Sequence, residues 1–394
     1  MRYPISPEYL TVVPDPLVDL YKSLEDDIFA YICEQLKTGD ANEKTIELIR
    51  LLQRRGLPLE KIEKRIKKTA RLTQVELDRA FDGAIERNRA FRRGVLDKLS
   101  LLGDTSRQRG LQAEISAIRR QTADEMRNIS NTLGFALRGV DGRVTAMPIR
   151  EAYVSVLDKA IVQIQSGAFS YQEAIRNSIR ELSDSGLQWV DYPSGWHNRV
   201  DVAVRRAVVT GISQLSGEYA EALAEEIGTD FVEVSAHRGA RDVGTGPKNH
   251  KSWQGKVYHV GGDVTRDGVR YKDFVTVTGY GTGEGLNGWN CRHKFYPFVP
   301  GVMERTYTDE ELKNIDPPPF EFEGHEYTAY EATQKQRQIE SAMRNVERRM
   351  IGYKAAGDDE AYHQARSKYR QLKKEYVAFS KAADLPTQMA RTKI

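Results

Sequence analysis

The sequence has few of the features that mark secreted or membrane proteins. Its 394 residues include only two cysteines, Cys33 and Cys291, too few for a disulfide framework. No window reaches the roughly 18 uninterrupted apolar residues that a membrane-spanning helix needs. Residues 1–16 also lack the charged-then-apolar pattern of a secretory signal. We therefore expect a soluble protein of a reducing compartment, without a membrane anchor.

Familiar catalytic spacings are missing as well. The chain has no CxxC, HxxxH or HExxH metal pattern, no GxSxG or SxxK nucleophile motif and no paired-carboxylate motif. Gly283, Gly285 and Gly288 formally match a dinucleotide fingerprint, but a β-like run follows them rather than a helix. Because that fingerprint binds pyrophosphate at a helix N-terminus, we interpret these glycines as loop flexibility.

Charge is nearly balanced overall but unevenly distributed. The chain has 59 Lys and Arg against 56 Asp and Glu, a net charge of +3, and 40% of its residues are hydrophobic. Residues 333–394 contain 14 of these cations and 7 of the anions, a local charge of +7, so the remainder carries −4. The low apolar fraction indicates long helices with narrow buried seams, and the charge excess marks the C-terminal segment as a distinct region.

Hydrophobic periodicity predicts a predominantly α-helical α+β protein of elongated shape. Apolar residues recur at spacings of three and four from Leu17 onward, and between about 59 and 137 they form a narrow seam typical of an antiparallel long-helix hairpin or coiled coil. The helical pattern stops where 12 of the 31 glycines cluster, between Gly239 and Gly288. These shifts predict an extended arm (1–16), a helical domain (17–229), a small Gly-rich α+β module (230–305), a Pro-rich linker (306–327) and a basic helical tail (328–394).

Several elements have local start or stop signals. Ser170 and Glu173 form a capping box for a helix at 170–184, and the tail should break at Gly357-Asp358. Further helices are expected near 148–166 and 196–228. Four β-like runs in the Gly-rich module are expected at 230–236, 256–260, 271–277 and 294–299.

The Gly-rich module also concentrates metal-binding residue types. Cys291 and His293 would share one face of a strand, so that both side chains could reach one ion. With His237 and His250 they make a Cys/His₃ set of the ligand types that zinc prefers. The alternatives are histidines used for hydrogen bonding and packing, or a hydrolase that uses the thiol or a bound metal. Zinc is the one cofactor that these residues indicate, and the favoured interpretation is a protein without catalytic activity.

The C-terminal segment is basic and interleaved with tyrosines. Such a helix can bind phosphate backbones without reading bases. A solvated helix whose tyrosines pack on neighbours would have the same pattern. The residues predicted to contact nucleic acid are Arg344, Arg348, Arg349, Arg366, Lys368, Arg370, Lys373 and Lys374.

Two stretches of the module carry a resemblance to a known family. They read VSAHRGARDVGTGPKNHKSWQGKVYHV (234–260) and GYGTGEGLNGWNCRHKFYPFVPG (279–301). The chain resembles the phage minor capsid protein 2 family and is more distantly similar to Mu-type head morphogenesis proteins. The resemblance covers most of residues 1–305. The matching positions are His237, Gly239, Ala240, Arg241, His250, Trp253, Gly255, Gly285, Asn290, Cys291, Arg292, His293, Pro297 and Gly301.

The resemblance implies a structural virion protein of a tailed bacteriophage, with no catalysis. It would be made in the infected bacterial cytoplasm and placed in the capsid interior or at the portal vertex, where it would aid head morphogenesis and DNA packaging or ejection. The implied partners are the portal protein and the capsid interior. Packaged double-stranded DNA would meet the basic tail, and the long helices would support docking or self-association.

Overall fold

The computed structural model describes residues 3–36, 45–101, 107–139 and 141–388, which fold into two compact units. The first unit comprises Met1–Leu17, Gln74–Glu125 and Arg205–Gln334. The second unit comprises Val18–Thr73, Met126–Val204 and Lys335–Ile394. This interleaving differs from the consecutive domains expected from the sequence, because compactness depends on contacts between distant segments.

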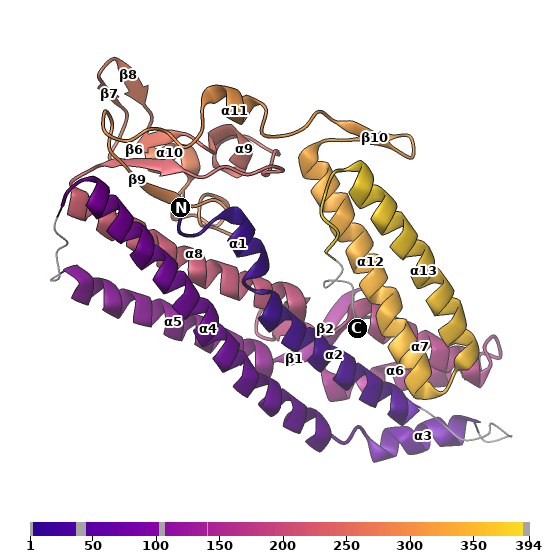
Figure 1. The fold of residues 1–394 in the computed structure, drawn as a ribbon. Coiled ribbons are helices and arrows are strands. Elements are labelled where there is room, and N and C mark those ends of the chain that lie inside the picture. The colour runs from indigo at the N-terminus through magenta and orange to yellow at the C-terminus, as the bar shows by residue number, and fades with distance from the viewer. Residues whose placement is uncertain (1–2, 37–44, 102–106, 140, 389–394) are drawn as a thin grey trace. The chain divides into compact units, whose positions relative to one another are not determined.

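Helices dominate and the strands form small antiparallel sheets, which confirms the predicted α-helical α+β class (Figure 1). The helices are α1 (Pro7–Val12), α2 (Asp15–Leu36), α3 (Thr45–Arg55), α4 (Glu60–Lys98), α5 (Arg107–Asn131), α6 (Ile149–Gln165), α7 (Tyr171–Ser185), α8 (Val200–Ile227), α9 (His250–Trp253), α10 (Phe274–Thr278), α11 (Asp309–Lys313), α12 (Ala329–Ala356) and α13 (Asp359–Ala382), with a 3₁₀ turn η1 (Gly246–Lys248). The strands are β1 (Leu133–Arg138), β2 (Val144–Pro148), β3 (Gln188–Asp191), β4 (Trp196–Arg199), β5 (Phe231–Val234), β6 (Val257–His259), β7 (Val264–Arg266), β8 (Val269–Tyr271), β9 (Phe295–Phe298), β10 (Phe320–Phe322) and β11 (His325–Tyr327). Across the described ranges, no helix is both long enough and apolar enough to cross a membrane.

Helix α1 spans Pro7–Val12 and α2 begins at Asp15, where an extended arm over 1–16 was expected. Helix α1 follows Ser6, whose hydroxyl accepts a hydrogen bond from the Tyr9 amide at 3.2 Å. Pro7 occupies the first helical position, where the missing N–H of proline costs nothing. The prediction of an extended arm is therefore corrected, because a proline-rich composition does not distinguish extended chain from a helix start.

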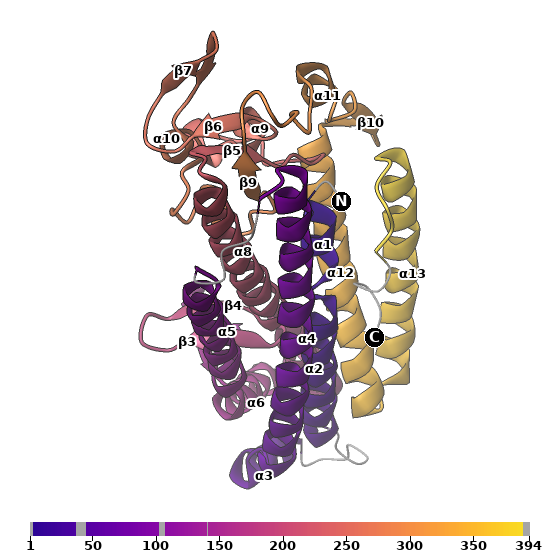
Figure 2. The ribbon, with the colours of Figure 1, turned by 60° about the vertical axis from the view of Figure 1, so that its left-hand side comes forward.

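The long-helix hairpin forms, and it is shorter than the predicted 59–137. In the first unit, Arg119 of α5 pairs with Asp78 of α4 at 2.6 Å, and Phe81 of α4 is buried. Figures 1 and 2 both show α4 and α5 lying side by side. Helix α5 gives way to β1, which ends the hairpin early. Residues 102–106, between α4 and α5 in the sequence, lie outside the described residues.

The second unit contains a four-stranded antiparallel sheet of order β2-β1-β3-β4 that the sequence pattern does not reveal. Helices α6 and α7 pack on β1, in which Phe135 and Leu137 are buried. The predicted capping box forms at the start of α7, between Ser170 and Glu173. The strands span four to six residues each, so the longer helical signals on either side obscure them.

Helices α12 and α13 form an antiparallel hairpin, which belongs to the second unit from Lys335 onward (Figure 2). The hairpin turns at Gly357, whose φ is 78°, and Asp358 caps α13 by accepting the Ala361 amide at 3.0 Å. The predicted break is therefore confirmed. The last predicted residues of the tail, 389–394, lie outside the described residues.

The Gly-rich module lies in the first unit around a three-stranded antiparallel sheet of order β6-β5-β9. Three of the four expected β-like runs contain these strands. The fourth, 271–277, is largely helix α10, because the Asp273 carboxylate accepts the Thr276 amide at 2.7 Å and starts a helical turn. The expected linker at 306–327 also has its own structure, namely α11 and the β10–β11 hairpin.

Candidate functional site

Three of the four predicted metal ligands converge in the Gly-rich module. One ligand atom from each of His250, Cys291 and His293 lies within 4.8 Å of the others, and all three side chains are buried. We refer to these three residues as the His/Cys cluster. His237, the fourth predicted ligand, stacks on His293 instead, with ring centroids 4.3 Å apart and an interplanar angle of 24°.

Three different local structures bring the cluster residues together. His250 is the first residue of α9, which Asn249 caps with its side chain. Cys291 follows Asn290, a residue with a φ of 57° in a turn. His293 lies just before β9, so Cys291 and His293 are not on one strand as predicted. They meet nevertheless, with Cys291 Sγ 3.8 Å from His293 Nδ1.

Close backbone packing shapes the turn that presents Cys291. A Cβ atom at Gly285 would lie under 3.0 Å from the Gly279 carbonyl, and one at Gly288 would lie under 3.0 Å from the Gly283 carbonyl. Only glycine allows so close an approach of two backbone segments. The interpretation of these glycines as loop flexibility is therefore corrected, since they permit a tightly packed turn.

Hydrogen bonds define the tautomers of the cluster imidazoles. His250 Nε2 lies 2.9 Å from the Glu284 carbonyl oxygen, and His293 Nε2 lies 3.0 Å from Gln254 Oε1. Gln254 Oε1 also accepts the His237 amide at 3.0 Å, which identifies it as the amide oxygen. Because both partners can only accept, Nε2 carries the proton on each neutral ring and Nδ1 keeps the lone pair.

Burial keeps these imidazoles uncharged. It lowers the pKa of His237 to about 3, with the Arg292 charge adding to the effect. It likewise lowers the pKa of His250 to about 4, and the nearby Arg241 charge acts in the same direction. Burial also places the pKa of His293 well below its ordinary value. The neutral imidazole is the form that binds metals, so the module presents its histidines as ligands at neutral pH.

Trp253 encloses the cluster. Its ring centroid lies 4.7 Å from that of His250 and 4.9 Å from that of His293, and its indole N–H donates to the Pro247 carbonyl at 3.1 Å. No cluster side chain is more than 3% exposed. This arrangement suits packing or metal binding, and it does not present the thiol of Cys291 to a substrate as the alternative hydrolase interpretation requires.

Two of the residues predicted to contact nucleic acid are buried inside the second unit. The side chains of Arg344 and Arg348 are 2% and 0% exposed, and both pair with Glu25 of α2, at 2.9 and 3.3 Å. Arg344 also pairs with Asp26 at 2.8 Å and with Glu347 at 3.1 Å. The prediction that Arg344 and Arg348 contact DNA is therefore corrected, because a phosphate cannot reach a guanidinium enclosed in protein.

The remaining predicted cations lie at the surface. Arg349 of α12 pairs with Asp184 at 2.5 Å. On α13, five exposed cations fall within an arc of about 100° and span about 22 Å of helix, given 100° and 1.5 Å per residue. Lys368 is exposed on another face of the helix. The five cations, which we call the α13 stripe, are Arg366, Arg370, Lys373, Lys374 and Lys381.

Two residues that hold these sites together, Gln254 and Glu25, are not among those predicted from the sequence. Gln254 joins two histidines of the Gly-rich module, and no local pattern around it indicates that role. Glu25 joins two buried arginines, and one signal does point to it. It shares the spacing of Tyr21, Ile28 and Ile32 on the apolar face of α2, where a carboxylate needs a buried partner.

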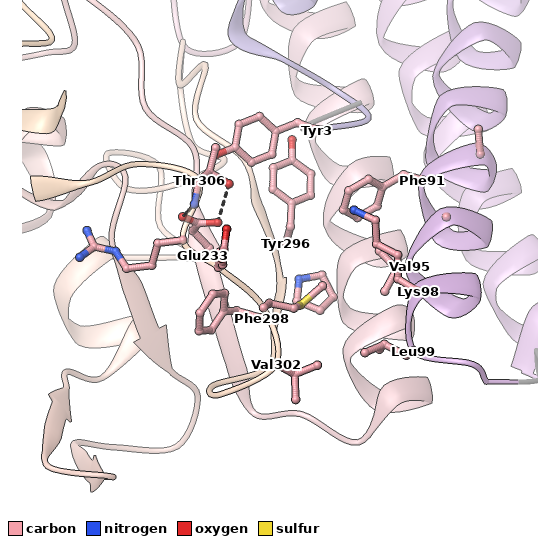
Figure 3. A pocket seen from close by; sticks show the side chains of 16 residues that line it. Tyr3, Phe91, Val95, Lys98, Leu99, Glu233, Tyr296, Phe298, Val302 and Thr306 are labelled. Carbon is pink, nitrogen blue, oxygen red and sulfur yellow. Dashed lines mark hydrogen bonds between the residues drawn. The ribbon is translucent and has the colours of Figure 1, made fainter.

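A separate hollow of about 700 Å³ lies in the first unit (Figure 3). Tyr3 and Tyr296 stack in its wall with centroids 4.6 Å apart, opposite Phe91 of α4. The Thr306 amide and hydroxyl donate to the Glu233 carboxylate at 2.6 and 2.8 Å, the bonds dashed in Figure 3. None of the His/Cys cluster residues lines this hollow, so the two features are distinct.

Comparison with known proteins identifies the family. The model of the family described as phage minor capsid protein 2 matches residues 5–380. The chain belongs to this minor capsid protein family. The match confirms the sequence resemblance and extends it beyond residue 305, through α12 and nearly all of α13.

One relative of this minor capsid family protein is described as "Structural protein" from Lactococcus phage LL-H. It is 25% identical over 173 residues, which are 42% of this chain and 45% of the relative, so the alignment spans less than half of either protein. No solved structure matches the chain. Family membership makes the chain a structural component of a bacteriophage virion.

Proposed function

We propose that this minor capsid protein acts inside the phage head at the portal vertex, with the α13 stripe against packaged DNA. Family membership supports the structural role in the virion. The observation that carries the DNA contact is the one-sided row of exposed cations on α13. Contacts to phosphates are independent of base sequence, which suits a protein that meets whatever DNA fills the head.

The charge around the stripe supports this assignment. Residues 361–382 contain six Lys and Arg and one acid, Glu375. Glu375 is paired with Lys335 of α12 at 3.5 Å, so its charge is partly compensated. On the opposite side of α13, Tyr376 and Phe379 are buried and fasten the helix to its neighbours. The helix is thereby held with a basic face to solvent.

A salt series on the full chain tests the DNA contact. Fluorescence anisotropy with a labelled random-sequence duplex should give weak binding that falls steeply as salt rises. The variant Arg370→Gln, Lys373→Gln, Lys374→Gln removes three neighbouring cations of the stripe. Because each lost phosphate contact lowers the slope of log affinity against log salt by about 0.9, we expect the slope to fall by roughly 2 to 3.

A matched control uses three exposed cations of α4. The variant Lys67→Gln, Lys68→Gln, Arg71→Gln removes the same number and types of charge. We expect it to leave the salt slope close to that of the unmodified chain. Equal losses in both variants would show that binding follows net charge alone, and an unchanged slope in the α13 variant would remove the stripe from the proposal.

Cross-linking of intact particles tests the location. We expect mass spectrometry of cross-linked virions to find this chain joined to the portal protein, through the long helices α4 and α5 that we assign to docking or self-association. Cross-links confined to tail proteins, or protein accessible to protease on intact particles, would contradict a position inside the head.

A further inference from the structure

We propose that the His/Cys cluster binds one zinc ion through Cys291 Sγ and the Nδ1 atoms of His250 and His293. The ion would join the start of α9, the glycine turn and the segment before β9, three parts of the module that are distant in sequence. This proposal is independent of any contact with DNA.

The geometry requires little movement. One ring nitrogen of each histidine and Cys291 Sγ lie within 4.8 Å of one another, and the Sγ–Nδ1 distance between Cys291 and His293 is 3.8 Å. Around a tetrahedral zinc with Zn–S near 2.3 Å and Zn–N near 2.0 Å, ligand atoms lie about 3.3 to 3.5 Å apart. A closure of at most about 1.5 Å therefore brings all three to bonding distance. Water is assigned the fourth position, because His237 is engaged in stacking on His293.

The outer hydrogen bonds match those that orient metal-binding histidines. Such a histidine usually donates its second ring N–H to a carbonyl or carboxylate oxygen, which aims the lone pair of the other nitrogen at the ion. His250 does this with the Glu284 carbonyl, and His293 does it with the Gln254 side chain. Both imidazoles therefore keep an Nδ1 lone pair that is available to an ion.

The thiol supplies the charge that the ion requires. Lys294 is buried, donates to the His293 carbonyl at 2.7 Å and interacts electrostatically with Cys291. Arg292 and Arg241 add positive charge near the imidazoles. Neutral histidines alone would not retain a dication among these charges. On binding, the S–H bond breaks, its proton passes to solvent and a Zn–S bond forms, so affinity should increase with pH.

Metal analysis of the full-length protein tests the site. After removal of bound metal with a chelator and re-addition, we expect one zinc per chain and a melting temperature that rises with free zinc. Cobalt(II) in place of zinc should give a thiolate-to-metal charge-transfer band in the near ultraviolet and tetrahedral d–d bands in the visible. This spectrum reports a sulfur ligand in the unmodified chain, so the test does not depend on the folding of a variant.

Matched substitutions identify the ligands. Cys291→Ser should abolish the charge-transfer band and weaken zinc binding at least tenfold. The controls are Cys33→Ser, which alters the other buried cysteine, and His259→Asn, which alters a module histidine outside the cluster. Both controls should keep one zinc and the band. Less than stoichiometric zinc in the unmodified chain, a cobalt spectrum without a thiolate band, or loss of the band in Cys33→Ser would overturn the proposal.

Discussion

The buried arginines of the second unit allow a quantitative prediction for the substitution Glu25→Gln. Burial alone would raise the pKa of Glu25, but the charges of Arg348 and Arg344 hold it at about 2, against an ordinary value of 4.5. A displacement of this size corresponds to about 3 kcal/mol of favourable interaction with the ionised carboxylate. The carboxylate therefore supports the fold chiefly through its charge.

Glutamine removes that charge with little change in shape. Its side-chain oxygen can still accept the Leu187 amide, which now donates to Glu25 Oε1 at 2.7 Å. Arg344 keeps Asp26 and Glu347 as partners, whereas Arg348 keeps only uncharged acceptors among its hydrogen bonds, including the Ser183 carbonyl at 2.8 Å. Since an unpaired buried charge is strongly unfavourable, we expect Glu25→Gln to lower the free energy of unfolding by about 3 to 5 kcal/mol.

A double-mutant cycle separates charge from packing. Replacement of Arg348 by Met in the Glu25→Gln background removes the uncompensated charge, so the double variant should be more stable than Glu25→Gln alone, with a coupling energy of at least about 2 kcal/mol. Arg349→Met is the matched control on the same helix. Its partly exposed pair with Asp184 should contribute under about 1 kcal/mol.

Denaturant unfolding measures these differences in the free energy of unfolding. Hydrogen exchange in peptides that cover α12 and β3 then shows where in the structure the stability is lost. Exchange at the Leu187 amide reports directly on its bond to residue 25. A loss below about 1 kcal/mol in Glu25→Gln, or an equal loss in Arg349→Met, would refute the reasoning that the buried charge requires its partner.

Three further predictions concern other parts of the chain. Burial raises the pKa of Glu347 from 4.5 to about 7, so the stability it contributes is complete below pH 4.5 and is lost as pH rises toward 7 and above. As pH rises from 5 to 8, the free energy of unfolding should therefore decrease by roughly 2 kcal/mol, seen as a lower denaturation midpoint. Glu347→Gln should make the free energy of unfolding less dependent on pH, and an unchanged pH dependence in this variant would contradict the raised pKa of Glu347. Gly288→Ala should destabilise the Gly-rich module by about 1 to 3 kcal/mol, because the new Cβ meets the Gly283 carbonyl, and faster hydrogen exchange around Cys291 would show it. Tyr376→Phe removes the hydroxyl that accepts a hydrogen bond from the Gln388 amide at 2.8 Å. Denaturant unfolding should show a loss of about 1 kcal/mol in the free energy of unfolding, and no measurable loss would show that water replaces the hydroxyl as acceptor.

Elements with signals among near neighbours in sequence were predictable. The capping box at Ser170 and Glu173 and the break at Gly357-Asp358 each depend on residues a few positions apart, and both form as expected. The segment at 271–277 was misread, because its alternating apolar pattern suits a strand whereas the cap supplied by Asp273 starts a short helix. The alternating pattern and the capping residue indicate different structures there, and the hydrogen bond from the Thr276 amide to the Asp273 carboxylate stabilises the helix.

The candidate sites were predictable only in part. Composition indicated that cysteine and histidines would gather in the Gly-rich module, and three of the four do converge. Which histidine stays outside depends on the stacking of His237 on His293, a contact between residues 56 positions apart in the sequence. The basic tail was likewise recognisable, but its division into buried and exposed arginines was not.

By itself, the sequence determined the helical class, the start of α7 at Ser170, the break at Gly357-Asp358, the family resemblance and the basic character of the C-terminal segment. These properties depend on residue type and on neighbours within a few positions. Only the tertiary structure decided that Arg344 and Arg348 lie inside the protein while Arg370 and Lys373 face solvent. The physical reason is that a charge can be buried only where a partner compensates it, and that partner, Glu25, lies some 320 residues away along the chain.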